Sequence, residues 1–219
     1  MSGARSDRAP WLRIADPIFR SRRLTRHLFG IDPGPLNHDA FDLASLALLR
    51  GIRAWVPPGA RVLELGTGPG AVLAASMARR SARVVAWEAH EASARAAQQR
   101  VAATPWLDCV AVVHGRLGPD SDLGDATIVV ANPPYVPRAQ GEALGLDPTR
   151  RHAWCGGEDG LDSYRALGAA LEGRFAGPLV LGGNRLFHRA RTVAALLRRR
   201  PQQLRYAGPG WAALLTGGD

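Results

Sequence analysis

The tetrapeptide Asn132-Pro133-Pro134-Tyr135 combines groups that could bind a flat, nitrogen-bearing substrate. The side chain of Asn132 offers a carbonyl oxygen, and proline offers a backbone carbonyl at a fixed φ with no N–H of its own. Tyr135 adds an aromatic face against which a planar group can lie. The lone pair of an amide or aromatic NH2 nitrogen is delocalised, so rigid acceptors that orient it would raise the rate of its attack on an electrophile. The tetrapeptide therefore predicts chemistry at a planar nitrogen, with Asn132, Pro133, Pro134 and Tyr135 as candidate catalytic residues.

A glycine-rich turn upstream, Gly66-Thr67-Gly68-Pro69-Gly70, could hold the electrophile. Glycines permit a tight turn and a close approach of the backbone to a ligand. Glu64 precedes the turn, and its charge would attract a cationic ligand and repel a pyrophosphate. S-adenosylmethionine carries an ammonium and a sulfonium, so it fits this turn better than a nicotinamide dinucleotide. Its product after methyl transfer is neutral, so the chemistry requires no metal.

Glu88 follows the next strand-like run and could accept hydrogen bonds from both ribose hydroxyls of a cofactor. Dinucleotide-binding folds use an acid at the same place, so Glu88 does not discriminate between the two cofactors. Both motifs also have a purely structural interpretation, because glycine clusters and Asn-Pro or Pro-Pro steps commonly mark turns. Their order after predicted strands favours the functional interpretation.

Strand-like and helical segments alternate along most of the chain. The predicted strands are 61–65, 83–87, 108–114, 126–131, 178–181, 203–206 and 211–215. The predicted helices are 39–50, capped by Asn37 and closed by Gly51, then 70–80, 90–101, 161–171 and 186–200, with a long loop over 136–159.

This alternation predicts an α/β, Rossmann-like fold: a seven-stranded, mostly parallel sheet with helices on both faces. The last two strands are expected to form an antiparallel edge hairpin over Gly208-Pro209-Gly210. Ligands of such sheets bind outside the carboxyl ends of the strands. Gly66, Glu88 and Asn132 all fall at such ends, so the sequence predicts that they share one site.

The composition indicates a single packed domain, because 219 residues with 46% hydrophobic content suffice for one full core. The net charge of +9 is carried by 28 basic residues, all of them arginine, which indicates a compositional bias rather than a nucleic-acid surface. Cys109 and Cys155 lack the spacing of a zinc site and are expected to be structural. No signal peptide or membrane span is evident, so the sequence predicts a cytoplasmic protein that does not bind membranes.

Residues 1–36 form a basic segment in which arginines are interleaved with apolar residues. We expect its apolar residues to pack on the main domain; a lid or a substrate-docking surface is the alternative. The arginines are Arg5, Arg8, Arg13, Arg20, Arg22, Arg23 and Arg26, and the apolar residues are Trp11, Leu12, Ile14, Ile18, Phe19, Leu24, Leu28 and Phe29.

The glycine turn followed by the tetrapeptide resembles class I S-adenosylmethionine-dependent methyltransferases that modify amide or exocyclic nitrogens. With Val136-Pro137 and the block 153–162 (Ala-Trp-Cys-Gly-Gly-Glu-Asp-Gly-Leu-Asp), it looks like the HemK/PrmC protein-glutamine methyltransferases. The short N-terminal segment is more similar to the eukaryotic and archaeal branch, which lacks the bacterial helical substrate domain. The resemblance covers roughly residues 37–200. We expect a basic N-terminal arm or lid over residues 1–36 and a methyltransferase domain over residues 37–219.

The resemblance also implies a set of cofactor-binding residues, with Asn132 holding the target nitrogen. They are Glu64, Gly66, Thr67, Gly68 and Gly70 at the methionine part, Glu88 and Ala89 at the ribose, and Gly115 and Arg116 after the third strand. The chain departs from the family where an acid usually meets the adenine amine, because it has His114-Gly115-Arg116, where a backbone contact could substitute. It has Leu181-Gly182-Gly183-Asn184 where bacterial members often show an acid.

The leading expectation is therefore an N-methyltransferase of a protein glutamine, with a translation release factor as the protein partner. The alternatives are an adenine of RNA or DNA, a small metabolite with a planar nitrogen, or a non-catalytic module that retains the cofactor fold. The sequence does not predict the oligomeric state.

Overall fold

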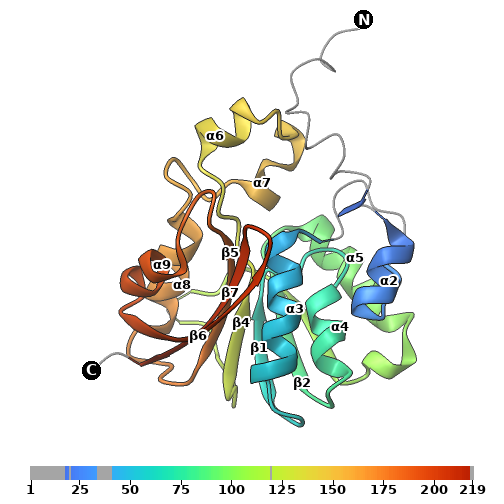
Figure 1. The fold of residues 1–219 in the computed structure, drawn as a ribbon. Helices are drawn as coiled ribbons and strands as arrows, with labels where there is room; N and C mark the ends of the chain where they lie inside the picture. Colours follow the sequence, from blue (N-terminus) through green and yellow to red (C-terminus); the bar gives the residue numbers. More distant parts are fainter. Residues whose placement is uncertain (1–17, 20, 34–40, 119, 218–219) are drawn as a thin grey trace, which may run out of the picture.

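The computed structural model describes residues 18–19, 21–33, 41–118 and 120–217. A central sheet is covered by helices on both faces (Figure 1). The strands are β1 (Arg61–Leu65), β2 (Arg83–Glu88), β3 (Val110–His114), β4 (Ile128–Ala131), β5 (Leu179–Asn184), β6 (Arg199–Ala207) and β7 (Gly210–Gly217). The helices in this part of the chain are α2 (Arg22–Phe29), α3 (Leu43–Trp55), α4 (Val72–Ala78), α5 (Glu91–Ala102), α6 (Arg138–Ala143), α7 (Arg151–Trp154), α8 (Asp162–Leu171) and α9 (Ala190–Leu196), with short 3-10 turns η1 (Pro105–Leu107) and η2 (Pro148–Arg150).

The seven strands lie in the order β3-β2-β1-β4-β5-β7-β6. The first five pair in parallel, and β7 is antiparallel to both β5 and β6. The predicted fold class is confirmed: a mostly parallel, Rossmann-like sheet that ends in an antiparallel edge hairpin.

The sheet separates two apolar cores. Successive residues of a strand point to opposite faces, so Val62 of β1 belongs to the core under α3 and α4, whereas Leu63 belongs to the core under α8 and α9. Val130 and Val129 of β4 divide in the same way. Strands buried on both faces read as continuous apolar runs, which is why the central strands could be located from the sequence.

Helix α3 differs from its predicted position over residues 39–50. It begins after Asp42, whose side chain accepts a hydrogen bond from the backbone N–H of Ser45 in a capping box, and it runs on to Trp55. The predicted cap Asn37 lies outside the described residues. The prediction that Gly51 closes the helix is wrong, because Gly51 is an interior position where a Cβ would lie 2.7 Å from the Trp55 ring.

The prediction of a long loop over 136–159 is also wrong, because the segment contains α6, η2 and α7. We call residues 138–154 the insert; it lies beyond the carboxyl ends of the strands (Figure 1). Its helices have six and four residues, too short to show a helical period. The Trp154 ring holds them together: it packs on Gly141, and its Nε1 donates to the Asp147 carbonyl at 3.0 Å.

The last predicted helix, 186–200, is shorter than expected, and the first strand of the hairpin is longer. Helix α9 ends at Leu196, Arg198 has a positive φ of 51°, and β6 begins at Arg199. Arg199 and Arg200 therefore belong to the sheet. The other predicted elements are confirmed with small shifts of their boundaries.

Part of the N-terminal segment lies within the described residues, and there it packs on the main domain. Phe29 is 1% exposed, its ring centroid lies 5.5 Å from that of Phe41, and α2 contacts α4. This agrees with the packing interpretation of the apolar residues. Arg5, Arg8, Trp11, Leu12, Arg13, Ile14 and Arg20 lie outside the described residues, and the division of the chain at residue 36 stays a prediction.

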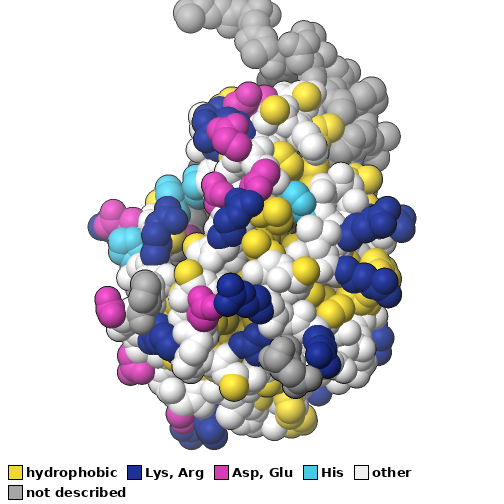
Figure 2. All heavy atoms as spheres, turned by 90° about the vertical axis from the view of Figure 1, so that its left-hand side faces the viewer, with side chains coloured by type: hydrophobic (Ala, Val, Ile, Leu, Met, Phe, Trp, Pro, Cys, Tyr) yellow, Lys and Arg dark blue, Asp and Glu magenta, His cyan; other side chains and the backbone are white. Residues whose placement is uncertain are grey.

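Basic side chains on the side of the molecule that carries α8, α9 and the β6 edge are mixed with acidic ones (Figure 2). Arg165 pairs with Asp159, and Arg198 pairs with Glu172. On this face the arginines behave as ordinary surface residues. Within the described ranges, no helix has both the length and the apolar character needed to cross a membrane.

Candidate active site

The sheet brings the predicted site residues together at one edge. Strand β1 lies between β2 and β4, and Leu65 is level with Trp87 on one side and Ala131 on the other. The loops that begin at Gly66, Glu88 and Asn132 therefore leave the sheet side by side. A Cβ on Gly66 would lie 3.9 Å from the backbone oxygen of Asn132, so the glycine turn borders directly on the tetrapeptide.

The glycine turn has a backbone that only glycine adopts without strain. Gly66 and Gly68 have φ values of 75° and 64°. A Cβ on Gly68 would meet no atom of the described residues within 4 Å, so this part of the chain leaves open space above the backbone of the turn. The N–H of Gly68 donates to Glu88 Oε2 at 2.9 Å, which fixes the turn to the end of β2.

Glu64 is a buried carboxyl group that is only partly satisfied. It is 1% exposed, and its Oε2 accepts a hydrogen bond from the Thr67 hydroxyl at 3.0 Å. Its Oε1 is buried without a hydrogen-bond partner among the described residues. Burial raises the pKa of Glu64 to about 8, against the opposing effect of the Thr67 hydrogen bond. An ammonium group would satisfy the free oxygen and stabilise the ionised form, so this site fits the cationic part of S-adenosylmethionine.

Glu88 is 8% exposed and joins two backbone segments. Besides the contact with Gly68, its Oε1 accepts from the N–H of His90 at 2.8 Å. Among the described residues each carboxylate oxygen accepts one hydrogen bond, so each can accept another. The role of Glu88 toward a ribose stays a prediction.

The remaining predicted cofactor residues lie around Glu88 and on the turn. The N–H of Gly115 donates to the Glu88 carbonyl at 2.9 Å. Ala89 and Arg116 are exposed, and Gly70 lies where a Cβ would meet Val72 at 3.2 Å. What recognises an adenine here stays a prediction.

Asn132 holds its side-chain amide in one orientation. Its Nδ2 donates to Ser45 Oγ at 3.0 Å and to Asp42 Oδ1 at 3.3 Å. Its Oδ1 is buried, and no hydrogen-bond partner for it lies in the described part of the chain. The oxygen that the sequence predicts to accept a substrate N–H is thus the one that the described residues leave without a partner.

Sequence reasoning missed Asp42 and Ser45, although a signal existed. An Asp-x-x-Ser pattern before an apolar run is typical of a helix start, but the sequence analysis places the cap at Asn37. That the same cap binds a loop ninety residues away is not visible in local sequence.

Tyr135 is tied to the same carboxylate. Its hydroxyl donates to Asp42 Oδ2 at 2.6 Å, its side chain is 8% exposed, and its ring lies 6.0 Å from that of Phe187. Burial and the nearby Asp42 charge raise the pKa of the Tyr135 hydroxyl well above its usual value, so it remains a donor. Its predicted stacking on a planar substrate stays a prediction.

The block 155–160 packs directly on the tetrapeptide backbone. A Cβ on Gly156 would lie 2.6 Å from the Pro134 oxygen, and one on Gly160 would lie 2.6 Å from the Tyr135 oxygen. The contact covers the carbonyl of Pro134, so Pro133 is the proline whose carbonyl we expect to face a substrate. The sulfur of Cys155 donates to the Gly157 carbonyl at 3.7 Å, in line with the structural role expected of this cysteine.

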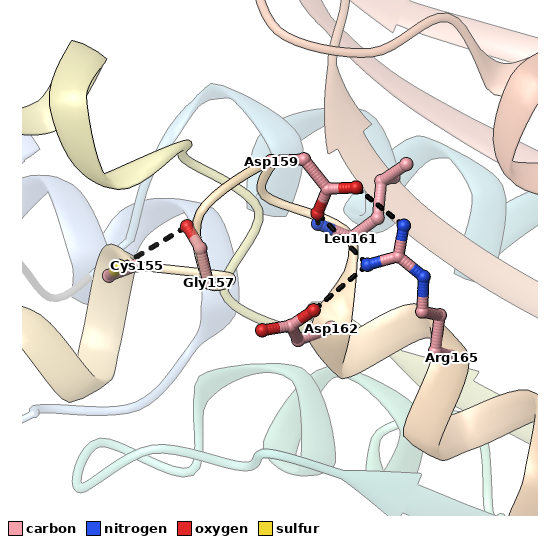
Figure 3. A network of polar contacts seen from close by, with 6 residues as sticks. All are labelled: Cys155, Gly157, Asp159, Leu161, Asp162 and Arg165. Carbon is pink, nitrogen blue, oxygen red and sulfur yellow. Dashed lines mark hydrogen bonds and ion pairs between the residues drawn. The ribbon is translucent and has the colours of Figure 1, made fainter.

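Figure 3 shows how this block is joined to α8. Arg165 lies between Asp159 and Asp162 and binds both carboxylates, and Asp159 also accepts from the N–H of Leu161 at 3.0 Å. The hydrogen bond from Arg165 lowers the pKa of Asp159 to about 2. The network fixes the turn that presses against the tetrapeptide.

The insert contacts the cofactor side of the site through two histidines. The rings of His152 and His90 stack 3.9 Å apart at an angle of 6°. His90 directly follows the β2 end that carries Glu88, so α7 lies against the rim of the predicted cofactor site. Burial lowers the pKa of His152, and the adjacent His90 contributes to this shift.

This chain is similar in sequence to known methyltransferases. No family model matches the chain. It is 33% identical over 184 residues to the release factor glutamine methyltransferase of Rhodospirillum rubrum, covering 76% of this chain and 50% of the relative. It is also 33% identical over 127 residues to the tRNA1(Val) (adenine(37)-N6)-methyltransferase of Bacteroides thetaiotaomicron, covering 56% and 49%. The chain spans about half the length of these curated relatives.

Solved structures share the fold at low sequence identity. A methyltransferase from Pyrococcus furiosus aligns with a TM-score of 0.59 and 15% identity, covering 94% of this chain and 98% of that one. A ribosomal protein L11 methylase from Lactobacillus delbrueckii subsp. bulgaricus aligns with a TM-score of 0.55 and 22% identity, covering 86% and 84%. The chain therefore has the Rossmann-like fold of the class I methyltransferases.

Proposed function

We propose that this chain is an S-adenosylmethionine-dependent N-methyltransferase whose acceptor is the side-chain amide of a protein glutamine, of the kind found in a translation release factor. One observation carries the N-methyl transfer. Asn132, whose buried Oδ1 has no partner among the described residues, borders through its backbone oxygen on a glycine turn that those residues leave open at Gly68. An acceptor for an N–H and a place for a cationic methyl donor are adjacent.

The residues of the chain would divide the work in the following way. The donor would supply an electrophilic methyl group on its sulfonium. Glu64 and the glycine turn would hold it, with the Glu64 carboxylate at the ammonium. Asn132 Oδ1 and the Pro133 carbonyl would each accept one N–H of the substrate amide, which directs the nitrogen lone pair at the methyl group. Both acceptors sit on a rigid turn, so their orientation is established before the reaction and adds little reorganisation cost.

Two observations favour glutamine over other planar nitrogens. The match to the release factor glutamine methyltransferase of Rhodospirillum rubrum covers 76% of this chain, against 56% for the tRNA enzyme of Bacteroides thetaiotaomicron. The glycine-rich and acidic block that resembles the glutamine-modifying family packs on the tetrapeptide, as a substrate-side element would. The tRNA relatives make an adenine amine the second candidate, because its exocyclic NH2 is also planar and would bind the same acceptors.

A screen of acceptors with tritiated S-adenosylmethionine tests the proposal. We expect label in a release factor, loss of label when the glutamine of its Gly-Gly-Gln loop is changed to alanine, and loss of label with the Asn132→Ala enzyme. Unchanged labelling of the Gln→Ala release factor would refute the glutamine assignment. Labelled tRNA would move the assignment to adenine, and full activity of Asn132→Ala would refute the role of the tetrapeptide.

A further inference from the structure

We propose that Asp42 is a positioning residue for the methyl-transfer reaction: together with Ser45 it locks the Asn132 amide so that its oxygen, and not its nitrogen, faces the substrate. The inference rests on the proposed N-methyl transfer. It adds to the site a residue that lies outside both the tetrapeptide and the glycine turn. Asp42 lies at the start of α3, ninety residues before the amide that it binds.

One carboxylate collects four hydrogen bonds from two separate segments. Asp42 Oδ1 accepts from the Ser45 N–H at 2.6 Å, the Ser45 hydroxyl at 2.7 Å and Asn132 Nδ2 at 3.3 Å. Asp42 Oδ2 accepts from the Tyr135 hydroxyl at 2.6 Å. Ser45 is 5% exposed, so these contacts are shielded from competing water. Both functional ends of the tetrapeptide, Asn132 and Tyr135, are thus held by the same side chain.

The chemistry of these partners permits only one orientation of the amide. A side-chain amide can be turned by half a rotation, which exchanges its oxygen and its NH2 group. The carboxylate of Asp42 only accepts hydrogen bonds. The Ser45 hydroxyl gives its single hydrogen to Asp42, so it presents only a lone pair to Asn132. The turned amide would place its oxygen against two acceptors, which is repulsive, so Asn132 Oδ1 must lie on the opposite side.

A glycine keeps space on that opposite side. Gly182 of β5 lies where a Cβ would come within 2.8 Å of Asn132 Oδ1 and 2.5 Å of a Leu48 methyl group. Any side chain at position 182 would crowd Asn132 Oδ1, and the glycine there avoids this contact.

The charge of Asp42 also strengthens the acceptor that it positions. A carboxylate that binds the NH2 end of an amide polarises it and makes its oxygen more negative, because hydrogen bonds in series reinforce one another in a buried site. The substrate nitrogen gains positive charge as it takes the methyl group, so a more negative Asn132 oxygen stabilises the transition state more than the bound substrate. Loss of Asp42 should therefore lower kcat more than it weakens substrate binding.

The test compares Asp42→Asn with wild type, with Ser45→Ala as the second variant and Asp122→Asn as the matched control. Asparagine also caps helices well, so Asp42→Asn keeps the helix start and an oxygen toward Asn132 Nδ2, while it removes the negative charge and turns its NH2 group toward the Tyr135 hydroxyl. Asp122 likewise accepts one backbone N–H, from Gly124, in an exposed loop outside the site. The assay uses an acceptor that the screen with tritiated S-adenosylmethionine has identified. For Asp42→Asn we expect kcat to fall about 100-fold and KM to change by less than about threefold. Asp122→Asn should match wild type in both.

A double-mutant cycle separates positioning from a merely structural role. In an Asn132→Ala background, Asp42→Asn should change the residual kcat by less than about threefold, because the amide that it orients is gone. An equal loss in both backgrounds, or a kcat of Asp42→Asn within threefold of wild type, would overturn the inference. If Asp42→Asn does not fold, the same cycle with Ser45→Ala decides, with a smaller expected loss of about 10-fold.

A second readout does not depend on any acceptor. The side-chain NH2 signals of Asn132, identified by their loss in Asn132→Ala, should exchange slowly with solvent in wild type and at least tenfold faster in Ser45→Ala, which removes the acceptor 3.0 Å from Nδ2. Equal exchange in the two proteins would overturn the inference. If Asn132→Ala keeps full activity the proposed function fails, whereas if Asn132→Ala is inactive and Asp42→Asn is normal only the present inference fails.

Discussion

Replacement of Glu64 by glutamine should abolish a pH dependence of stability that this buried carboxyl group imposes. The folded protein keeps the proton of Glu64 up to about pH 8, whereas the unfolded chain loses it near pH 4.5. Because the folded pKa is raised, the contribution to stability is fully present below the unfolded value and is lost as the pH rises toward 8. Between these values one proton is released on unfolding, so the free energy of unfolding falls by about 1.4 kcal/mol per pH unit.

The pH slope is a sharper observable than the stability itself. From pH 5 to pH 7 wild type should lose about 3 kcal/mol from this group alone. Glutamine cannot ionise, so the slope of Glu64→Gln should be flatter by about 1.4 kcal/mol per pH unit, even if its unpaired NH2 group costs about 1–3 kcal/mol at every pH. Urea denaturation at several pH values measures both quantities. Glu172→Gln makes the same substitution at an exposed position and should keep the wild-type slope.

The ionisation of Glu64 should also control how tightly the cofactor product binds. A ligand ammonium requires the ionised carboxylate, so binding of S-adenosylhomocysteine should release a proton. Its affinity should rise up to about tenfold per pH unit between pH 6 and 7.5, and Glu64→Gln should bind weakly at every pH. Calorimetry in buffers of different ionisation enthalpy counts the proton. The reasoning is refuted if Glu64→Gln retains the wild-type slope of stability, or if it binds the ligand as tightly as wild type.

Three further substitutions test contacts in and around the site. Asn132→Ala should lower methyl transfer by about 100- to 1,000-fold while its melting temperature stays within a few degrees of wild type, as measured by labelling and calorimetry. Gly156→Ala should cost about 1–3 kcal/mol and most of the activity, because its Cβ would lie 2.6 Å from a backbone oxygen; Gly173→Ala, with φ of 67° and no atom within 4 Å of its Cβ, should cost only about 1 kcal/mol and leave transfer intact. Arg165→Ala should reduce the fall in melting temperature between about pH 4 and pH 2. The pKa of Asp159 in the folded protein is lowered to about 2, so its contribution to stability is present above pH 3.8 and is lost as the pH falls toward 2. An unchanged fall in melting temperature would show that this ion pair does not stabilise the fold.

The central sheet and the main site could be predicted because their signals are local. The β4 strand is a continuous apolar run that Asn132 follows, and the glycine turn follows β1 directly, so both motifs could be placed at the carboxyl ends of strands. The insert was missed because its helices are stabilised by one ring, Trp154, packed on a glycine thirteen residues earlier in the chain. Gly51 was misread because its closeness to Trp55, and not a helix end, accounts for the glycine.

Asp42 could not be predicted as part of the site because its second function is long-range. The local pattern predicts only a helix cap, while the contacts with Asn132 and Tyr135 exist only after β1 and β4 have paired and α3 has packed on the sheet. The sequence predicts Asn132 and Tyr135 as site residues but does not predict the carboxylate that binds both of them.

The alternation of β4 has a consequence for how the molecule tolerates change. Val129 and Val130 are chain neighbours, yet each stabilises a different half of the protein, so cavities made at the two positions should be mechanically independent of each other. Both valines nevertheless lie close to the same side-chain amide, because Asn132 follows Val130 by two residues and Val129 by three. A cavity on either face of the sheet can thus displace β4 and, through it, Asn132. The position of the substrate nitrogen would therefore depend on the packing of both cores.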